Sequence, residues 1–335
     1  MDSPDIVKKS VRLDTRLSPA QAWAEAVEQE RSRALAWLTD DGGSTPERAV
    51  HQARRACKRL RALLRLAEPV LGEPATDARR WVAASARQLA PARDATVRAR
   101  SLESMLARYA GVLDAAALVD FQARFAIEAP SEMPEHARGD AVATLEALGE
   151  LLADAGLQRL SRRSMLRGAK LAYGKTRRRW RAARKGDDPA DWHALRSASQ
   201  VHLNQLKALR DITAGNFRAR QRKLNSLVKL LGDAHDLAML RVALADQCGS
   251  DAAGLLAALL LPALQAEELA CYTAARELAA KLFDKRPRVF RERLDQAWVD
   301  ARSDDELGDQ DSDEHCAEPD IDETTSRLSD GRASQ

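Results

Sequence analysis

Apolar residues recur every three to four positions along most of the chain, which is the spacing of one face of an α-helix. In residues 50–67, one side of a helical wheel holds Val50, Ala53, Cys57, Leu60, Leu64 and Ala67. Runs in which apolar and polar residues alternate, as they do in half-buried β-strands, are missing from the sequence. The pattern therefore predicts an all-α protein with a core face along each helix.

Local start and stop signals divide this pattern into helices. Ser18-Pro19 and Thr45-Pro46 are typical starts, because a hydroxyl side chain caps the first turn and proline fits its first position. The first series of predicted helices covers residues 19–39, 46 to about 70, a stretch through 81 and 89, and 112–127, before a linker at 129–134. The second series covers 157–185 with breaks at Gly168 and Gly174, a helix opened by Pro189, then 217–247, 252–283 and a last helix through Trp298.

A basic helix occurs twice in the sequence, at a fixed offset of about 142 residues. The offset relates His51 and Arg54 to His193 and Arg196, Arg93-Asp94 to His235-Asp236, and Arg80 and Arg87 to Arg222 and Lys229. Repetition on this scale implies two copies of one supersecondary unit. We therefore expect two four-helix bundles related by a pseudo-twofold axis, formed by residues 15–155 and 156–302.

Cations line one face of the first basic helix. An arc of roughly 80°, on the side away from the core face, holds His51, Arg54, Lys58, Arg61 and Arg65. Like charges at this spacing repel each other by a few tenths of a kcal/mol per pair, and no acidic residue follows them before Glu68. An anionic chain along the stripe would relieve this repulsion and accept charge-assisted hydrogen bonds. The stripe therefore predicts a polyanion-binding surface.

The second copy of the stripe is diluted. At the offset of about 142 residues, Arg55, Lys58, Arg61 and Arg65 correspond to Ser197, Gln200, Leu203 and Lys207. Because fewer cations remain, we expect the second copy to contribute less affinity than the first.

Charge is unevenly distributed along the 335 residues. Of 53 Lys and Arg and 50 Asp and Glu, residues 300–335 hold 3 and 13, so residues 1–299 hold 50 and 37, a balance of +13. A basic body of this kind indicates an anionic partner. The segment 303–335 has few large apolar side chains, so we expect a disordered acidic tail that either competes for the basic surface or only solubilises the protein.

Cysteine spacing and hydropathy limit the class of protein further. The four cysteines are far apart, which favours neither a zinc site nor a disulfide framework, and no other cofactor is indicated. The N-terminus has no apolar stretch of the signal-peptide type, and the longest apolar run, 252–264, is too short to span a bilayer. The sequence therefore predicts a reduced cytoplasmic protein that does not enter a membrane. The oligomeric state stays open.

Two other functions remain alternatives at this point. The same basic surface could bind nucleic acid, although the stripe contains no aromatic residue for base stacking, and Tyr173, Trp180 and Trp192 lie only near the second basic region. The doublet His235-Asp236 could belong to a metal-dependent phosphohydrolase. Only six histidines are present, however, and His202 falls on the apolar side of its helix, so the ligand set is incomplete.

These motifs resemble the CHAD family, the conserved histidine α-helical domain, over roughly residues 15 to 300. The residues that carry the resemblance are His51, Arg54, Arg55, Lys58, Arg59 and Arg61, then Arg93-Asp94, then Tyr173, Lys175, Arg177 and Arg178, and finally His193-Ala-Leu-Arg196 and Leu231-Gly-Asp-Ala-His-Asp236. The resemblance implies two helical bundles with pseudo-twofold symmetry. It also implies binding of inorganic polyphosphate through the basic residues and association with polyphosphate granules.

Catalysis is not expected. Some relatives carry a CYTH triphosphatase domain, but its Glu-x-Glu-x-Lys signature does not occur here, so the resemblance implies a stand-alone binding module. The predicted polyphosphate-binding residues are His51, Arg54, Arg55, Lys58, Arg61, Arg65, Arg87, Arg93, Lys175, Arg178, His193, Arg196, Lys207, Arg222, Lys229 and His235.

Overall fold

The structure is a computed structural model, which describes residues 11–40, 44–89, 103, 107, 135–153, 155–186, 188–246, 248–249 and 251–313. Every regular element in these ranges is helical, which confirms the predicted all-α fold. The expected helix 112–127, the linker 129–134 and the Arg93-Asp94 pair lie outside the described residues.

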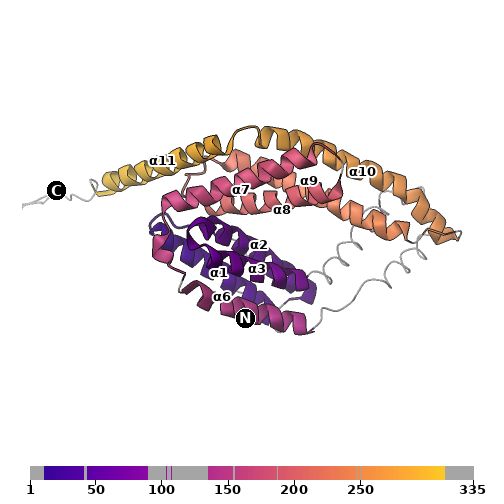
Figure 1. The fold of residues 1–335 in the computed structure, drawn as a ribbon, viewed down its shortest axis with the longest axis horizontal. Helices are drawn as coiled ribbons and strands as arrows, with labels where there is room; N and C mark the ends of the chain where they lie inside the picture. Colours follow the sequence, from indigo (N-terminus) through magenta and orange to yellow (C-terminus); the bar gives the residue numbers. More distant parts are fainter. Residues whose placement is uncertain are drawn as a thin grey trace, which may run out of the picture.

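The first four described helices form a bundle (Figure 1). They are α1 (Pro19–Thr39), α2 (Pro46–Leu71), α3 (Glu73–Gln88) and α6 (Glu135–Ala153), and α1 contacts α2, α2 contacts α3, α3 contacts α6, and α6 contacts α1. The predicted starts are confirmed, since Ser18 caps α1 in a reciprocal capping box with Gln21, and Thr45 accepts a hydrogen bond from the Arg48 backbone.

The second half begins with the short 3-10 helix η2 (Leu157–Arg159) and continues with α7 (Arg162–Ala183), α8 (Pro189–Ala208), α9 (Arg218–Ala245), α10 (Ala252–Leu282) and α11 (Pro287–Asp313). Figure 1 shows α9 and α10 as a long pair that reaches beyond the rest of the molecule. Helices α1 and α2 begin 27 residues apart, at 19 and 46, and so do α7 and α8, at 162 and 189. This spacing is compatible with an internal duplication. Helix α11 continues to Asp313, so the first part of the segment expected to be disordered is helical here.

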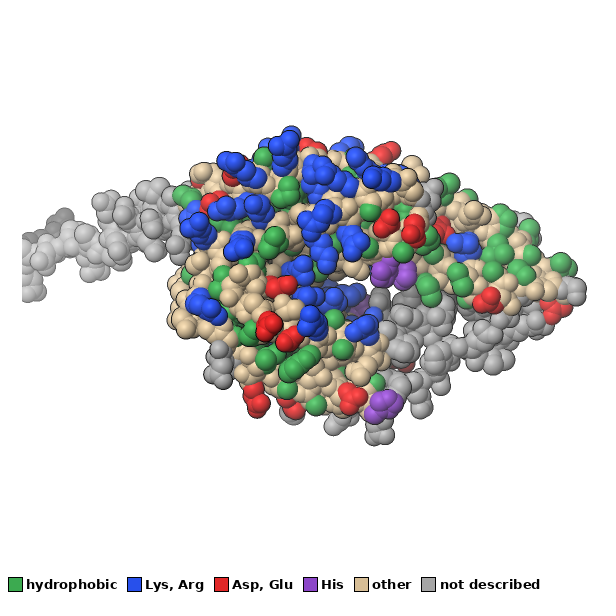
Figure 2. Space-filling view, in the orientation of Figure 1, with side chains coloured by type: hydrophobic (Ala, Val, Ile, Leu, Met, Phe, Trp, Pro, Cys, Tyr) green, Lys and Arg blue, Asp and Glu red, His purple; other side chains and the backbone are tan. Residues whose placement is uncertain are grey.

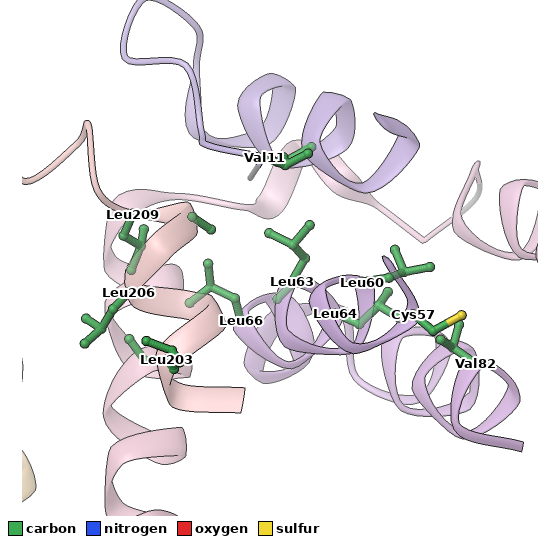
Figure 3. Packing of buried hydrophobic residues seen from close by; sticks show 14 of the residues in the cluster. Val11, Cys57, Leu60, Leu63, Leu64, Leu66, Val82, Leu203, Leu206 and Leu209 are labelled. Carbon is green, nitrogen blue, oxygen red and sulfur yellow. The ribbon is translucent and has the colours of Figure 1, made fainter. Parts of the chain in front are cut away.

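The two halves meet where α2 packs against α7 and α8. Leu66 of α2 lies near Leu203 and Leu206 of α8 (Figure 3), and the Gln205 side-chain amide donates a hydrogen bond of 3.2 Å to the Ala62 carbonyl. All six residues of the core face predicted for α2 are buried, which confirms that face. One cluster of buried apolar side chains extends through both halves, so α2 and α8 are held in a fixed relation to each other.

The breaks predicted at Gly168 and Gly174 are wrong, because α7 runs unbroken from Arg162 to Ala183. Gly168 instead permits close packing between helices. A β-carbon at this position would lie 2.0 Å from the Leu66 carbonyl oxygen of α2. At Gly174 the atom nearest to an added β-carbon would belong to the Pro287 side chain, at 3.5 Å, an ordinary contact. Gly168 therefore marks the α2–α7 contact. Periodicity alone could not distinguish a glycine that breaks a helix from one that allows two helices to pack closely.

We expect Gly168→Ala to destabilise the protein. Alanine gains about 1 kcal/mol in helix propensity, but the clash with the α2 backbone costs about 1–3 kcal/mol because a backbone atom cannot rotate away. Gly139→Ala in α6 is the matched control: nothing lies within 4 Å of its added β-carbon, so only the propensity gain applies. Urea denaturation of both variants measures the effect. Equal stabilisation by the two changes would contradict the packing explanation.

His202 belongs to the core, as predicted. It is fully buried on α8, with its ring 5.1 Å from that of Phe290 and 5.6 Å from that of Tyr173. Neither ring nitrogen has a hydrogen-bond partner among the described residues. Burial, reinforced by the nearby Arg220 guanidinium, holds the pKa of His202 well below its usual value of 6.5.

This histidine makes the stability of the fold depend on pH. The pKa of His202 is depressed in the folded state, so the unfolded chain takes up the proton first; its contribution is complete above pH 6.5 and is lost as pH falls below that value. We expect the free energy of unfolding to drop by about 1.4 kcal/mol between about pH 7.5 and 5.5 from this group. Urea denaturation of the wild type and of His202→Leu at both pH values isolates the contribution. An unchanged pH dependence in the variant would contradict it.

Helix α10 is long and apolar enough, by length and composition alone, to cross a membrane, with a mean hydropathy of 1.4 in its most apolar window within Gly254–Leu282. The helix continues through Pro262. Its apolar stretch is therefore longer than residues 252–264, the run that by itself is too short to span a bilayer. Core helices of soluble proteins share these properties. Part of α10 packs against α9 through buried leucines of both helices, including Leu240, Leu244 and Leu260.

Candidate functional site

A cavity of about 580 Å³ opens between the two halves of the molecule. Its lining comes from α2, α3, α8 and α9 and consists of Arg54, Lys58, Arg61, Arg79, Arg80, Ala83, Ala86, Arg87, His193, Arg196, Ser197, Gln200, Val201, His235, Asp236 and Met239. Figure 2 shows a band of Lys and Arg side chains across this face, with a hollow beside a group of His side chains. Seven residues predicted from the sequence line this cavity: Arg54, Lys58, Arg61, Arg87, His193, Arg196 and His235.

A smaller cavity of about 170 Å³ adjoins the first. It is lined by Arg61, Arg65, Arg79, Ala172, Lys175, Arg179, Ala194, Ser197, Ala198 and Val201, so it shares two of its arginines and two small residues with the larger cavity. We call the two connected cavities the groove. It brings the predicted residues Arg65 and Lys175 next to those of the larger cavity, and it adds α7 to the helices that supply cations.

The cations of the groove lie close enough to repel one another. Burial lowers the pKa of Arg61, and the charges of Arg79, Arg87 and Arg65 lower it further. Burial also lowers the pKa of Lys175, with Arg65, Arg79 and Arg179 adding to the effect. Arg61 Nε is moreover buried and has no hydrogen-bond partner among the described residues. A group of cations in this state is stabilised by an anion that supplies both charge and hydrogen-bond acceptors.

One carboxylate partly offsets this charge at the smaller cavity. Glu68 lies 3.4 Å from Arg65 and 3.3 Å from Arg79, measured between side-chain oxygen and nitrogen. It thereby links α2 to α3 and orients both guanidinium groups. Arg54 is oriented differently, by donating a hydrogen bond to the Ala86 backbone carbonyl of α3. These contacts fix the side chains, so the positive charge is organised before a ligand arrives.

Two histidines meet in the larger cavity. The His193 ring of α8 lies 5.1 Å from the His235 ring of α9, measured between ring centroids. Burial, with the nearby Arg196 charge as a second cause, lowers the pKa of His193, which keeps it neutral at pH 7. Asp236 follows His235 in the same wall of the cavity. A neutral His193 ring can donate or accept hydrogen bonds without adding to the charge of the arginines.

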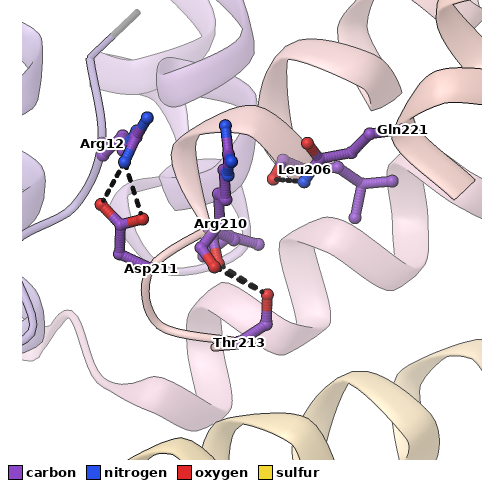
Figure 4. A network of polar contacts seen from close by, with 7 residues as sticks. Arg12, Leu206, Arg210, Asp211, Thr213 and Gln221 are labelled. Carbon is purple, nitrogen blue, oxygen red and sulfur yellow. Dashed lines mark hydrogen bonds and ion pairs between the residues drawn. The ribbon is translucent and has the colours of Figure 1, made fainter. Parts of the chain in front are cut away.

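The turn between α8 and α9 sets the position of this histidine pair. Thr213 Oγ1 donates to the Arg210 carbonyl at 3.1 Å, Gln221 Nε2 donates to the Leu206 carbonyl at 2.7 Å, and Arg12 pairs with Asp211 (Figure 4). The chain reverses through Ala214 and Gly215, whose φ angles are +42° and +74°. A left-handed turn of this kind favours glycine and fixes the direction in which α9 leaves α8.

The two halves contribute unequal charge to the larger cavity. The first half supplies six cations, Arg54, Lys58, Arg61, Arg79, Arg80 and Arg87, whereas the second half supplies Arg196, the two histidines and Asp236. Leu203, which corresponds to Arg61 in the repeat, is buried in the core. The geometry thus agrees with the diluted second copy seen in the sequence.

Comparison with known families identifies the chain. The family model for the CHAD domain matches residues 21–245, about two thirds of the sequence. The chain belongs to the CHAD family. A solved structure, the crystal structure of the CHAD domain from the plant Ricinus communis, is similar to this CHAD chain with a TM-score of 0.52 and 19% identity, covering 85% of this chain and 94% of that one. At this identity the likeness supports the fold alone. A search of curated proteins gave no match.

The remaining predicted residues of this CHAD domain lie outside the groove lining. Lys207 lies beside Arg55, Arg178 is exposed near Arg65, and Lys229 is exposed near Asp233. His51 and Arg222 are exposed, and neither lines the groove. Arg93 is outside the described residues.

Three groove cations were not among the predicted site residues: Arg79 and Arg80 of α3, and Arg179 of α7. A signal for the first two was present. Arg80, Ala83 and Arg87 repeat at helical spacing on one face of α3, and Arg79 adjoins that face. Arg179 lies in the basic run of α7, in which the sequence gives no reason to prefer one cation over the next.

The lining also bears on the alternative functions. Neither cavity is lined by Phe, Tyr or Trp from the described residues, and Tyr173, Trp180 and Trp192 are buried in the core. Among the residues that the structure describes, no group of three or more His, Cys, Asp or Glu side chains could hold a metal ion.

Proposed function

We propose that this CHAD protein binds inorganic polyphosphate in the groove without transforming it, in the cytoplasm and in association with polyphosphate granules. The observation that carries the proposal is the composition of the groove: ten Arg and Lys side chains from four helices, with no Phe, Tyr or Trp side chain among the described lining residues. CHAD domains are associated with polyphosphate binding, which supports the same ligand.

The chemistry of the ligand matches this composition. Every unit of a polyphosphate chain carries negative charge and oxygen acceptors. A guanidinium group can therefore pair in a bidentate way with any phosphate unit of the chain that lies next to it. Single-stranded nucleic acid spreads its charges further apart and gains much of its affinity from bases stacked on aromatic rings, about 1–3 kcal/mol per base. A groove of cations without such rings forfeits that gain. Polyphosphate is therefore the polyanion that the groove fits best.

A competition titration at physiological salt tests the proposal. Labelled long-chain polyphosphate is bound first and displaced by single-stranded DNA, RNA or heparin, with and without EDTA, while the chain length of the polyphosphate is followed on gels. We expect polyphosphate to be preferred, EDTA to have no effect and the chains to keep their length. Equal displacement by nucleic acid would mean that the groove binds polyanions in general and has no preference for polyphosphate. Chain shortening that EDTA abolishes would instead support a metal-dependent enzyme at His235-Asp236.

A further inference from the structure

The outer face of α10 is both apolar and exposed. Leu255, Leu259 and Leu269 are 61%, 65% and 59% exposed, and only 33% of the most apolar window of this helix is buried. The opposite face packs against α9 through buried leucines, and Figure 1 shows α10 along the outer edge of the molecule. Single apolar residues are ordinary on a protein surface, but a continuous apolar strip indicates a surface that binds another molecule.

Six exposed residues of α10 form one stripe along this face. Successive members lie four and three positions apart in alternation, and at 100° per residue all six fall within an arc of roughly 80°. We call them the outer stripe: Leu255, Leu259, Pro262, Ala266, Leu269 and Thr273. The same alternation of four and three brings the contacting side chains together when two helices pack side by side in a coiled coil. The spacing therefore indicates that the partner is another helix.

The charges of α10 narrow the choice of partner. Residues 252–275 contain no Lys or Arg, whereas a helix that lies on a membrane surface usually carries such cations beside its apolar face. The two carboxylates in this range lie off the outer stripe: Glu268 is buried and pairs with Arg241 of α9 at 3.2 Å, and Glu267 is half-buried. The outer stripe thus fits an uncharged helix face better than an anionic bilayer or a charged peptide.

The outer stripe is complementary to its own reverse. Its spacings read four, three, four, three and four in either direction, so a second copy of α10 can lie antiparallel against it in register. In this register Leu259 faces Leu269 of the second copy, and Pro262 faces the small Ala266 of the second copy. A twofold axis then generates each of these contacts twice.

We propose that two copies of this chain form a dimer by pairing their outer stripes antiparallel about a twofold axis. The pairing removes three exposed leucines of each chain from water, which is the source of its stability. Residues of α10 do not line either cavity of the groove, so the dimer is independent of the ligand that the groove binds.

Sedimentation equilibrium of the full chain measures the association. Between roughly 1 and 100 µM, where a weak dimer forms, we expect the mass to rise from 36.8 kDa to about twice that value. Leu259→Glu should raise the dissociation constant at least about tenfold, because the pairing would bury a carboxylate against leucine. Leu171→Glu is the matched control, since this leucine of α7 is 50% exposed and lies outside the outer stripe; it should dimerise like the wild type.

Charge pairs test the antiparallel register. Leu259→Lys with Leu269→Glu places a cation opposite a carboxylate at both ends of the pair, whereas Leu259→Glu with Leu269→Glu places two carboxylates there. We expect the first double variant to dimerise at least about tenfold more tightly than the second, and to lose this advantage as salt is added. Positions 259 and 269 of one chain are about 15 Å apart along the helix, so an intramolecular pair cannot produce the difference.

Three results would overturn the proposal. A wild-type mass that stays at 36.8 kDa at every concentration would assign the outer stripe to another occupant, such as a different protein or another segment of the chain. Equal dimerisation of the wild type and Leu259→Glu would place the interface elsewhere. Equal dimerisation of the two double variants would exclude the antiparallel register. Circular dichroism checks that each variant is folded, and Leu259→Gln replaces Leu259→Glu where folding fails.

Discussion

Replacing Arg54 and Lys58 together with glutamate is expected to weaken polyphosphate binding by at least about 100-fold, or about 2.7 kcal/mol. Both side chains line the larger cavity, and hydrogen bonds to charged groups contribute about 1.5–3 kcal/mol each. The change also places two carboxylates next to Arg61 and the α3 arginines, where they would pair with these cations and repel the ligand. Fluorescence anisotropy with labelled polyphosphate at fixed salt measures the loss.

A charge-matched control separates the site from the net charge of the protein. Arg163→Glu with Arg181→Glu makes the same change in net charge on the exposed surface of α7, away from the groove lining. We expect less than about a threefold effect, because exposed charges at a distance are screened by salt. Arg196→Glu with Gln200→Glu tests the dilution of the second copy and should cost less than the first pair. Equal losses from the Arg54 and Lys58 pair and from its charge-matched control would mean that affinity follows net charge alone.

Affinity is also expected to fall steeply as salt is added. A groove with ten Arg and Lys side chains can neutralise several phosphates, and each one neutralised releases condensed counterions. Six to ten such contacts reduce the affinity of proteins for DNA by roughly 10³–10⁵ between about 50 and 200 mM salt, and we expect a loss of this order for polyphosphate. Titrations at four salt concentrations give the slope of log K against log salt.

The slope itself carries information about the site. In Arg54→Glu with Lys58→Glu the slope should become shallower, because fewer phosphates are neutralised. The Arg163 and Arg181 double variant should keep the wild-type slope. A slope near zero in the wild-type protein would contradict binding through the cations of the groove and would favour a contact dominated by uncharged groups.

Helix positions were predictable because their causes are local. Ser18 and Thr45 cap the helices that follow them, as their residue types and the adjacent prolines predicted. The core face of α2 was predictable for a similar reason, since a 3.6-residue period in apolar residues decides which side is buried. Gly168 was misjudged because its role depends on Leu66, about 100 positions earlier in the sequence.

Parts of the site followed from sequence in the same way. The stripe on α2 was identified because its members repeat at helical spacing, and four of its five residues line the groove. His193 and His235 were found through the repeat, but their distance of 5.1 Å depends on the turn that directs α9 away from α8. Arg79 and Arg179 became site residues only when α3 and α7 were placed beside α2.

The sequence by itself determined the helical class of this protein, the helix starts, the buried face of α2 and the repeat of basic residues, because capping, periodicity and charge spacing act within one or two helical turns. Only the tertiary structure decided which cations share a cavity. Arg65 lies in the groove, whereas its counterpart Lys207 does not line either cavity. That division depends on how α2 packs against α7 and α8, and such packing is set by close contacts such as that of Gly168 with Leu66, between residues far apart in the chain.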